Sequence, residues 1–580
     1  MAQRMNILTR HLFNIALLLV SFDCFAQTGN VSYALDKATI TKGQNLFQVK
    51  CANCHNFKQQ AIGPNLTGIT SQVSPQYLQK FIRNSQELIK AGDKRAVAVF
   101  NRFKVPMPPN PDLTNDDLHA LLSFIHTQKA QPQTVDKSTA GLGQPKDNPI
   151  PAIIKKSDLV INLQQVATAP ATSDKIPVAR INQMTVLSGS KERLFLHDLR
   201  GPLYEMKDTM FDVIFDMSKR MPHFMHSPGH ASGFGSFAFH PEFYDNGLLY
   251  TTHTEKTTGK KSDFGFEDSI KIFYQWVLTE WKLKDPGAAE FEGMPRELLR
   301  IDVPSQIHGV QQISFNEVAS RDSADYGLLY IGIGDGGSAE SGYSHLCNST
   351  KTILSTIIRI DPAGNNSRNG NYGIPDNNPF AKSKDKTIVK EIFARGFRNP
   401  NRFTWTSDGK MLASDIGLAN IEELNLVVAG KDYGWPMREG SFLLNYRGKM
   451  HKVYNLPAGK WPYINPVAQY DHDEGNAISG GFVYEGSIQA LRGKYVFGDI
   501  VKGRLFYVEA KELQLNRGSA IKEFNVSFNN EISDFLKITN SAKADLRLGR
   551  GPEKELYIFT KTDGKIWKVT GCTKENESGK

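Results

Sequence analysis

The spacing of apolar residues changes once along the chain, near residue 130. Before that point apolar side chains recur at helical intervals, and one helix face is the clearest: Leu118, Leu121, Leu122 and Ile125. Thr114, with Asp117 three positions later, predicts the capped start of this helix. The pattern predicts a small all-α domain of short helices around a central pocket, which we place at residues 27–130.

After about residue 173 the helical spacing gives way to short apolar runs bounded by Gly, Asp, Asn and Pro. Six runs of similar composition recur, at residues 193–197, 247–251, 327–334, 410–414, 493–498 and 555–560. They predict an all-β propeller over residues 173–572, because each blade buries its faces only against neighbouring blades. Residues 573–580 form a C-terminal tail.

The segment between the two patterns, residues 131–172, is rich in Gln, Pro, Lys, Thr and Ser and has no sustained period. This composition predicts a linker between two domains. A chain of 580 residues is too long for one ordinary core, which agrees with a multidomain protein.

The first 26 residues have the pattern of an export signal. Arg4 and Arg10 supply positive charge, residues 12–22 form an apolar run, and Cys24-Phe-Ala26 resembles a cleavage site. We expect a mature chain that starts at Gln27 in the periplasm, with an uncleaved anchor as the alternative. No later segment reaches spanning length without charged residues.

The charge distribution argues against one class of partner. The formal net charge is +9, yet the 69 Lys and Arg residues are dispersed among 60 acidic residues. A nucleic-acid-binding protein would gather its basic residues into a stripe or patch. The mildly basic surface suits docking of a downstream periplasmic electron acceptor.

Cys51-Ala-Asn-Cys54-His55 carries the strongest chemical signal in the sequence. Thiols at this spacing reach the two vinyl groups of haem, and the adjoining imidazole supplies an axial nitrogen. A redox dithiol or half of a zinc site would leave His55 without a role, and no second Cys-x-x-Cys exists. The motif predicts haem c bound covalently by Cys51 and Cys54, with His55 on the iron.

The second axial ligand should lie on a loop before the last helix of this domain. Met107 stands there between prolines, and a thioether ligand raises the haem potential, which suits electron acceptance. A buried core methionine is the alternative. The whole segment resembles the small single-haem class I cytochromes c.

Two further cysteines, Cys347 and Cys572, follow in the larger domain. An exported protein meets oxidising conditions, but the sequence does not show whether the two Cα atoms approach each other. Paired and free states therefore both remain open.

Several stretches of the larger domain resemble the glucose/sorbosone dehydrogenase family, which includes soluble quinoprotein aldose dehydrogenases built as six-bladed propellers. The stretches follow the family's order, at residues 236–243, 307–308, 330–337, 358–362, 375–380, 391–400, 422–426, 433–436, 480–485 and 495–499. The resemblance implies a six-bladed propeller that uses pyrroloquinoline quinone (PQQ) to oxidise a sugar.

The resemblance also assigns roles to residues. It makes His308 the general base, Asp335 the carboxylate that orients it, and Arg398 with Asn399 the pair that faces the quinone. These residue types suit the chemistry, because imidazole titrates near working pH and a guanidinium stabilises growing negative charge. The alternatives are an interior histidine, a blade-packing ion pair and a hairpin turn at residues 335–337.

The same resemblance implies calcium. In the family backbone carbonyls hold the ion, and they correspond here to Gly417 and Leu418. A second, structural calcium would use Glu423 and the carbonyl of Tyr433, since hard cations prefer oxygen ligands. Alternatively, Glu423 only accepts hydrogen bonds from backbone amides.

The sequence departs from the family at the basic residues that bind the PQQ carboxylates. A late Arg-x-Arg pair of the family falls near Ala542 and Ala544. Four basic residues lie close by in sequence and could bind the PQQ carboxylates instead: Lys502, Arg504, Arg547 and Arg550. Of these we choose Lys502 and Arg547 as the candidates.

Two functions are therefore weighed. The first is a periplasmic quinoprotein dehydrogenase that oxidises an aldose or related alcohol and passes electrons to its own haem. The second is a non-catalytic propeller that binds a glycan or a protein and is fused to an electron-relay cytochrome.

Overall fold

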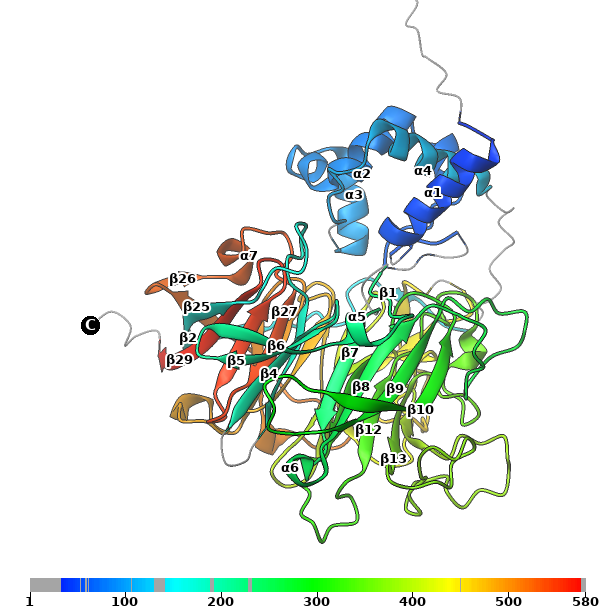
Figure 1. The fold of residues 1–580 in the computed structure, drawn as a ribbon. Helices are drawn as coiled ribbons and strands as arrows, with labels where there is room; N and C mark the ends of the chain where they lie inside the picture. The colour runs from blue at the N-terminus through cyan, green and yellow to red at the C-terminus, as the bar shows by residue number, and fades with distance from the viewer. Residues whose placement is uncertain are drawn as a thin grey trace, which may run out of the picture.

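A computed structural model describes residues 33–574 except 53, 58, 59, 61, 106, 130–140, 188–191, 228–231 and 449. The predicted export signal lies outside the described residues. Figure 1 shows a small group of helices above a much larger β domain. No helix in the described part of the chain has the length and apolar character needed to span a membrane.

Among its described residues the small domain has four helices and one short 3-10 turn: α1 (Lys37–Lys50), η1 (Ile69–Ser71), α2 (Pro75–Lys90), α3 (Lys94–Phe103) and α4 (Asn115–Thr127). The predicted start of α4 is confirmed, because the Thr114 and Asp117 side chains each accept from the other's backbone amide. The predicted apolar face of α4 packs with Phe47 of α1 as the core of this domain.

Gly43 lets α1 and α4 approach closely. A Cβ atom at residue 43 would lie 1.9 Å from the carbonyl oxygen of Ala120 on α4. The two helices can only cross at this distance because glycine has no side chain.

We expect Gly43→Ala to lower the melting temperature of the helical domain, since the added methyl group forces the helices apart. Overpacking of this kind costs about 1–3 kcal/mol. Thermal melts followed at the haem absorbance measure the change. Gly518→Ala is the control, because a Cβ at that position meets nothing within 4 Å. An unchanged melting temperature in Gly43→Ala would contradict the close crossing.

The large domain consists of antiparallel sheets that follow one another along the chain. The first sheet consists of β3 (Ile181–Leu187), β4 (Arg193–Asp198), β5 (Pro202–Lys207) and β6 (Met210–Asp216). The second consists of β7 (Phe234–Phe239), β8 (Leu248–Glu255), β9 (Tyr274–Leu283) and β10 (Gly293–Val303). The third consists of β11 (Val310–Phe315), β12 (Leu329–Ile333), β13 (Thr356–Ile360) and β14 (Ile392–Arg395). The next is β15 (Pro400–Trp405), β16 (Met411–Asp415), β17 (Ile421–Val427) and β21 (Ala468–Asp471).

A nine-stranded sheet completes the series. In spatial order it holds β22 (Ile478–Val483), β23 (Lys494–Asp499), β24 (Leu505–Glu509), β25 (Lys522–Phe528), β2 (Lys155–Thr168), β29 (Lys565–Lys574), β28 (Leu556–Thr560) and β27 (Leu546–Arg550), and β26 (Glu531–Ser533) pairs with β25. A small outlying sheet joins β1 (Pro145–Lys146), β20 (Val453–Tyr454), β19 (Phe442–Leu444) and β18 (Arg438–Glu439). Short helical turns complete the domain: α5 (Met217–Arg220), α6 (Phe243–Asn246), η3 (Ser344–Leu346), η4 (Gln489–Leu491), η5 (Ala510–Glu512) and α7 (Phe535–Ile538).

The inner strands of these sheets contact one another in a closed ring, in the order β3, β7, β11, β15, β22, β27 and back to β3. Large apolar clusters fill the spaces between successive sheets. The loops before the inner strands therefore meet at one end of the ring axis.

The linker prediction is wrong over Lys155–Thr168. This segment is β2, which runs parallel to β25 and antiparallel to β29. Both partners lie several hundred residues away in sequence, so the local pattern of residues 131–172 carried no sign of the pairing. β29 also continues to Lys574, beyond the predicted end of the domain at residue 572.

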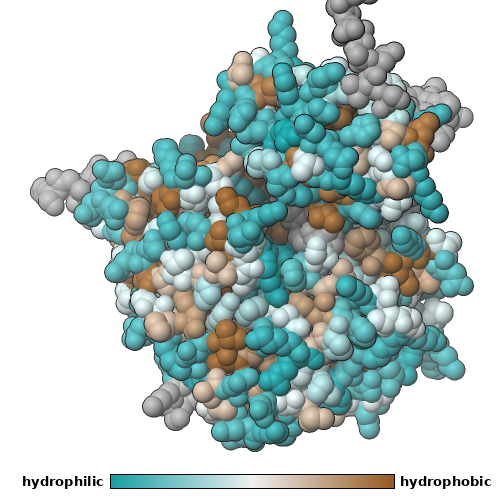
Figure 2. Space-filling model, turned by 45° about the horizontal axis from the view of Figure 1, so that its top comes forward, coloured by the Kyte–Doolittle hydropathy of each residue, from teal (hydrophilic) through white to brown (hydrophobic). Residues whose placement is uncertain are grey.

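The helical domain sits directly on the β domain, and polar side chains cover most of both in the view of Figure 2. Lys104 forms an ion pair of 3.1 Å with Asp473, and Lys175 forms one of 3.4 Å with Asp112. Ile62 packs against an apolar cluster of the β domain that contains Leu418. The loop that follows the haem-attachment motif thus touches the β domain.

Candidate functional site

His308 and Asp335 meet where two neighbouring segments of one sheet reach the end of the ring axis. His308 precedes inner strand β11 and Asp335 follows β12. The Nδ1 atom of His308 lies 2.6 Å from a carboxylate oxygen of Asp335, and both residues are buried. Burial raises the pKa of Asp335, but the charge and hydrogen bond of His308 and the charge of Arg398 outweigh it and hold this pKa below its ordinary value. The resemblance correctly placed this pair together.

Two further groups fix the Asp335 carboxylate. The indole Nε1 of Trp435 donates to the Oδ2 atom of Asp335 at 3.1 Å. The backbone amide of Gly337 donates at 2.8 Å to Oδ1, the oxygen that faces His308. Because the ionised carboxylate accepts from His308 Nδ1, the neutral imidazole keeps Nε2 as an acceptor. Trp435 had no role in the sequence analysis, because its contact crosses from residue 335 to residue 435.

The backbone at His308 is strained. Its φ angle is 56°, in the left-handed region that a residue with a side chain rarely adopts. Gly309, the next residue, packs against the Trp276 side chain: a Cβ atom on residue 309 would lie 1.7 Å from the indole nitrogen. Strain that the surrounding packing maintains is typical of functional sites, and it argues against a merely structural histidine.

Arg398 reaches the same end of the axis from the loop between β14 and β15. Its guanidinium forms a buried ion pair with Glu340 and donates to the carbonyl oxygens of Ile416 and Gly417. Burial lowers the pKa of Arg398, but Glu340 and Asp335 raise it above its ordinary value. Glu340 is a site residue that sequence reasoning missed, because no motif marked it.

Asn399 is held beside Arg398. Asp415, at the end of β16, accepts from the backbone amides of Arg398 at 2.9 Å and Asn399 at 2.6 Å. The Asn399 side-chain oxygen would lie 3.0 Å from a Cβ atom at Gly334, the residue before Asp335. The predicted quartet of His308, Asp335, Arg398 and Asn399 is therefore assembled in one place.

One of the two carbonyls predicted to bind calcium already has a partner in the protein. The carbonyl of Gly417 accepts from the Arg398 guanidinium, so a positive charge already stands against it. Glu439 binds the amides of four consecutive residues, including Leu418, and thereby fixes this loop. The Gly417 carbonyl therefore has a cation against it, whereas Glu439 engages the amide of Leu418 and not its carbonyl; calcium ligation here stays a prediction.

The second predicted calcium site, at Glu423 and the carbonyl of Tyr433, also stays a prediction. Glu423 accepts from the backbone amide of Gly440 and from the side chain of Asn425, as the alternative interpretation held. Tyr433 is buried, and its hydroxyl donates to the carbonyl of Leu426. Among the described residues no group of three or more His, Cys, Asp and Glu could hold a metal ion.

A cluster of buried cations lies next to the His308 site. Arg402, on inner strand β15, crosses the ring axis and donates to the carbonyls of Gln311 at 2.9 Å and of Asn182 on β3. Lys561 donates to the side chain of Asn182 at 3.0 Å. Burial and the charge of nearby Arg547 lower the pKa of Arg402 to about 9 and that of Lys561 well below its ordinary value.

The two predicted cofactor-binding cations differ in their surroundings. Arg547 belongs to this cluster: it is buried, burial lowers its pKa, and its Nε atom has no partner among the described residues. Lys502 instead donates to the carbonyl of Asp473, next to the ion pair with Lys104 of the helical domain. The structure therefore places Arg547 near the axis and Lys502 beneath the helical domain.

The haem-attachment motif begins at the C-terminal cap of α1. Cys51 is the cap residue, and the amide of His55 donates to its carbonyl at 2.9 Å. The Nδ1 atom of His55 lies 2.9 Å from the carbonyl of Pro64, so Nδ1 donates and Nε2 is free to bind iron. A Cβ atom at Gly63 would lie 2.6 Å from the His55 ring, which shows how tightly this loop packs the imidazole.

Met107 lies between α3 and α4. Asn110 holds this segment against α2, since its side chain donates to the carbonyls of Ile82 at 3.2 Å and Pro108 at 3.1 Å. The role of Met107 as the second iron ligand stays a prediction.

We expect Met107→Ala to lower the haem reduction potential and to change the low-spin spectrum, because the thioether that favours the ferrous state is lost. Redox titration of the full chain followed in the visible spectrum measures this. Met437→Ala, in the β domain, is the control. An unchanged potential in Met107→Ala would assign the ligand elsewhere.

The attachment motif faces the candidate site of the β domain. Cys54 is half-buried, and Ile62, in the loop after His55, packs against the apolar cluster that contains Trp435 and Ala339, the residue before Glu340. Burial raises the pKa of Cys54 to about 11. The haem-binding loop and the Arg398 ion pair are therefore neighbours, although they are far apart in sequence.

Cys347 and Cys572 are both free thiols. Cys347 is buried beside Ser338, near the Asp335 turn, whereas Cys572 lies on β29 and pairs across the sheet with Ile161. They belong to different apolar clusters, so they do not form a disulfide.

Comparison with known proteins agrees with this two-part architecture. A family model described as "Glucose / Sorbosone dehydrogenase" matches residues 216–567, and one described as "Cytochrome c" matches residues 40–129. The protein joins a helical cytochrome c domain to an all-β domain of the glucose/sorbosone dehydrogenase type. It belongs to the glucose/sorbosone dehydrogenase family and carries a cytochrome c domain.

Individual relatives are distant. The chain is 27% identical to the HIPL1 protein of Arabidopsis thaliana over 60% of this chain and 55% of the relative. It is 25% identical to quinoprotein glucose dehydrogenase B of Acinetobacter calcoaceticus over 37% of this chain and 42% of the relative. The chain thus spans about half the length of these curated relatives.

A solved structure shows the same fold in the β domain. A crystal structure of a glucose dehydrogenase superposes with a TM-score of 0.50 at 18% identity, covering 70% of this chain and 99% of that one. At this level of identity the likeness establishes the fold alone.

Proposed function

We propose that this protein is an exported quinoprotein dehydrogenase that oxidises an aldose or a related alcohol with PQQ and passes the electrons to its own haem c. A downstream periplasmic acceptor would then reoxidise the haem. One observation carries the proposal: the buried His308–Asp335 pair lies beside Arg398 and Asn399, and the loop after the haem-attachment motif packs through Ile62 on the cluster that contains Trp435, the donor to Asp335.

The β domain of this enzyme would be a six-bladed propeller. Four of its sheets have four strands each, and the nine-stranded sheet divides into two four-stranded blades, β22 to β25 and β2 with β27 to β29. The closed ring of six inner strands supports this division. β2 would then join the last blade to its neighbour and close the ring.

The residues around the axis fit PQQ, a tricarboxylate. Arg547 and Lys561 are buried with the half-buried Arg402 close by, and one anion, Asp545, lies 3.9 Å from Arg547. Burying an excess of like charges is costly unless further anions neutralise them. Several buried polar atoms nearby also have no partner among the described residues: Gln306 Nε2 and Oε1, Asn401 Nδ2 and Oδ1, Arg398 Nε and Arg547 Nε. A carboxylate-rich cofactor would supply both the charge and the acceptors. When bound, PQQ would accept two electrons from the sugar.

His308 would remove the proton from the substrate hydroxyl. Its Nε2 atom is the acceptor, and Asp335 stabilises the imidazolium that forms. Trp435 and Gly337 hold the Asp335 carboxylate in place during this transfer. Arg398 would stabilise negative charge at the reacting centre from its position beside Asn399.

The fused cytochrome makes electron transfer intramolecular. The attachment loop already touches the β domain through Ile62, and the Lys104–Asp473 ion pair holds the two domains together. A tethered acceptor is present at a high effective concentration, so the first transfer needs no diffusing partner.

A glycan-binding or protein-binding propeller without catalysis is the second candidate. Two observations favour it. The Arg398 guanidinium is already bonded to Glu340 and two carbonyls, and alanine stands at positions 542 and 544, where the family has arginine. The strained His308 and its firmly held Asp335 favour the enzyme.

We expect Arg547→Met to weaken PQQ binding about 10- to 100-fold, because a hydrogen bond to a charged group contributes about 1.5–3 kcal/mol. Titration of the full chain with PQQ measures this. Arg550→Met is the control, because Arg550 pairs with Glu317 at the surface.

If Arg547→Met bound PQQ as tightly as the wild type, this cation cluster would not be part of the cofactor site. Absence of PQQ binding by the wild-type chain would remove the dehydrogenase proposal.

A further inference from the structure

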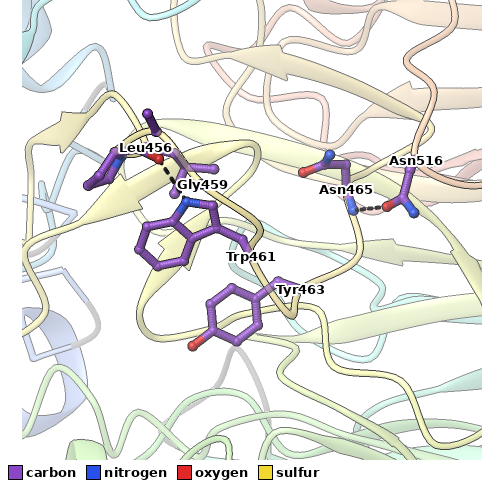
Figure 3. A pocket seen from close by; sticks show the side chains of 8 residues that line it. Leu456, Gly459, Trp461, Tyr463, Asn465 and Asn516 are labelled. Atoms are coloured by element: carbon purple, nitrogen blue, oxygen red, sulfur yellow. Dashed lines mark hydrogen bonds between the residues drawn. The ribbon is translucent and has the colours of Figure 1, made fainter.

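An open pocket of about 430 Å³ lies on the loop that leads into β21, and neither His308 nor Asp335 lines it. β21 is the last strand of its sheet, whereas His308 and Arg398 precede inner strands, so this pocket opens on a different part of the domain. Its lining is neutral: Leu456, Pro457, Ala458, Gly459, Trp461, Tyr463, Asn465 and Asn516 (Figure 3).

Trp461 is unusual among the six tryptophans of the chain. Its side chain is 36% exposed, whereas the other five are at most 5% exposed. The indole Nε1 donates to the carbonyl of Pro457 at 2.9 Å and so fixes the ring at the pocket wall. An exposed indole held rigid offers a binding face with little entropy left to lose.

Tyr463 extends this face. Its ring lies 26° from the plane of the Trp461 ring, with the two centroids 6.3 Å apart. The Arg438 guanidinium packs 5.8 Å from the Tyr463 ring centre, on the side of the domain core. Two nearly parallel aromatic rings therefore form one wall of the pocket.

Two amides supply polar groups near this wall. The Asn465 side-chain oxygen accepts from Arg438 at 2.6 Å, and the Asn516 side-chain oxygen accepts from the backbone amide of Asn465 at 2.8 Å. Because both oxygens are engaged, the NH2 groups are the parts of these side chains available to donate to a ligand.

We propose that this pocket is a carbohydrate-binding subsite for a neutral sugar. A pyranose ring with equatorial hydroxyls presents a flat face of C–H groups, which stacks on aromatic rings, while its hydroxyls accept hydrogen bonds from amides. The absence of charged side chains from this lining disfavours an acidic or basic ligand. The subsite would hold a saccharide at the edge of the β domain, independently of any reaction at His308.

A calorimetric titration of the full chain with a β-1,4-linked glucose tetrasaccharide tests the proposal. We expect binding that Trp461→Ala weakens by at least about tenfold. The variant should keep its melting temperature, because Trp461 is partly exposed and outside the apolar clusters. Leu515→Ala is the matched control: Leu515 is 38% exposed and adjoins Asn516 but does not line the pocket.

His308→Ala should bind the tetrasaccharide as the wild type does, which separates this subsite from the reaction. Binding that Trp461→Ala leaves unchanged would place the saccharide elsewhere and overturn the proposal. Absence of binding by the tetrasaccharide would overturn it too. So would binding of an oligoproline peptide in its place, since an aromatic groove can also recognise extended proline helices.

Discussion

His308→Ala is expected to slow reduction of the haem by an added aldose about 10²–10⁴-fold in protein loaded with PQQ. The variant loses the Nε2 atom that would take the substrate proton, while Asp335 and the cofactor-binding residues stay in place. Stopped-flow absorbance of the reduced haem gives the rate directly. The effect should fall on this rate and leave PQQ affinity within a few-fold of the wild type.

A second variant guards against a folding defect at the strained position. His308→Asn is suitable because asparagine adopts the left-handed backbone more readily than other residues, and the φ angle here is 56°. Both variants should keep the wild-type haem spectrum and the amount of haem reduced by dithionite. If both reduce their haem at the wild-type rate, His308 is a structural residue and the assigned base is wrong.

The second large effect concerns the haem itself. Replacing both Cys51 and Cys54 with serine should abolish covalent haem completely, because no thioether bond can then form. Haem staining after denaturing electrophoresis measures this. The β domain should keep its thermal transition, since its apolar clusters are separate from the core around Phe47 and α4.

Cys347→Ser combined with Cys572→Ser is the matched control. Both cysteines are free and lie in the β domain, so their loss should leave the haem attached. Retention of covalent haem in the Cys51→Ser, Cys54→Ser variant would show that the attachment site is not where the sequence places it.

The features that were predictable depend on local sequence. Thr114 and Asp117 are three residues apart, so their capping box could be recognised before the fold was known. The Cys-x-x-Cys-His motif is equally local. The quartet around His308 was placed through resemblance to a family, and the geometry assembles it.

The features that were missed depend on contacts distant in sequence. β2 is a strand because β25 and β29 flank it, and its own residues gave no such pattern. Glu340 and Trp435 join the site across 58 and 100 residues, respectively. The calcium prediction stays untested, although the Gly417 carbonyl that the resemblance assigned to the ion accepts from Arg398, a contact between residues 19 positions apart.

One measurement tests the central claim that sugar oxidation and haem reduction occur within one molecule. Protein loaded with PQQ is mixed with an aldose at several protein concentrations, and the rate of haem reduction is followed. We expect a rate constant that does not depend on protein concentration, because the acceptor is tethered beside the site. A rate that rises in proportion to protein concentration, or no haem reduction by any aldose or polyol, would contradict the account.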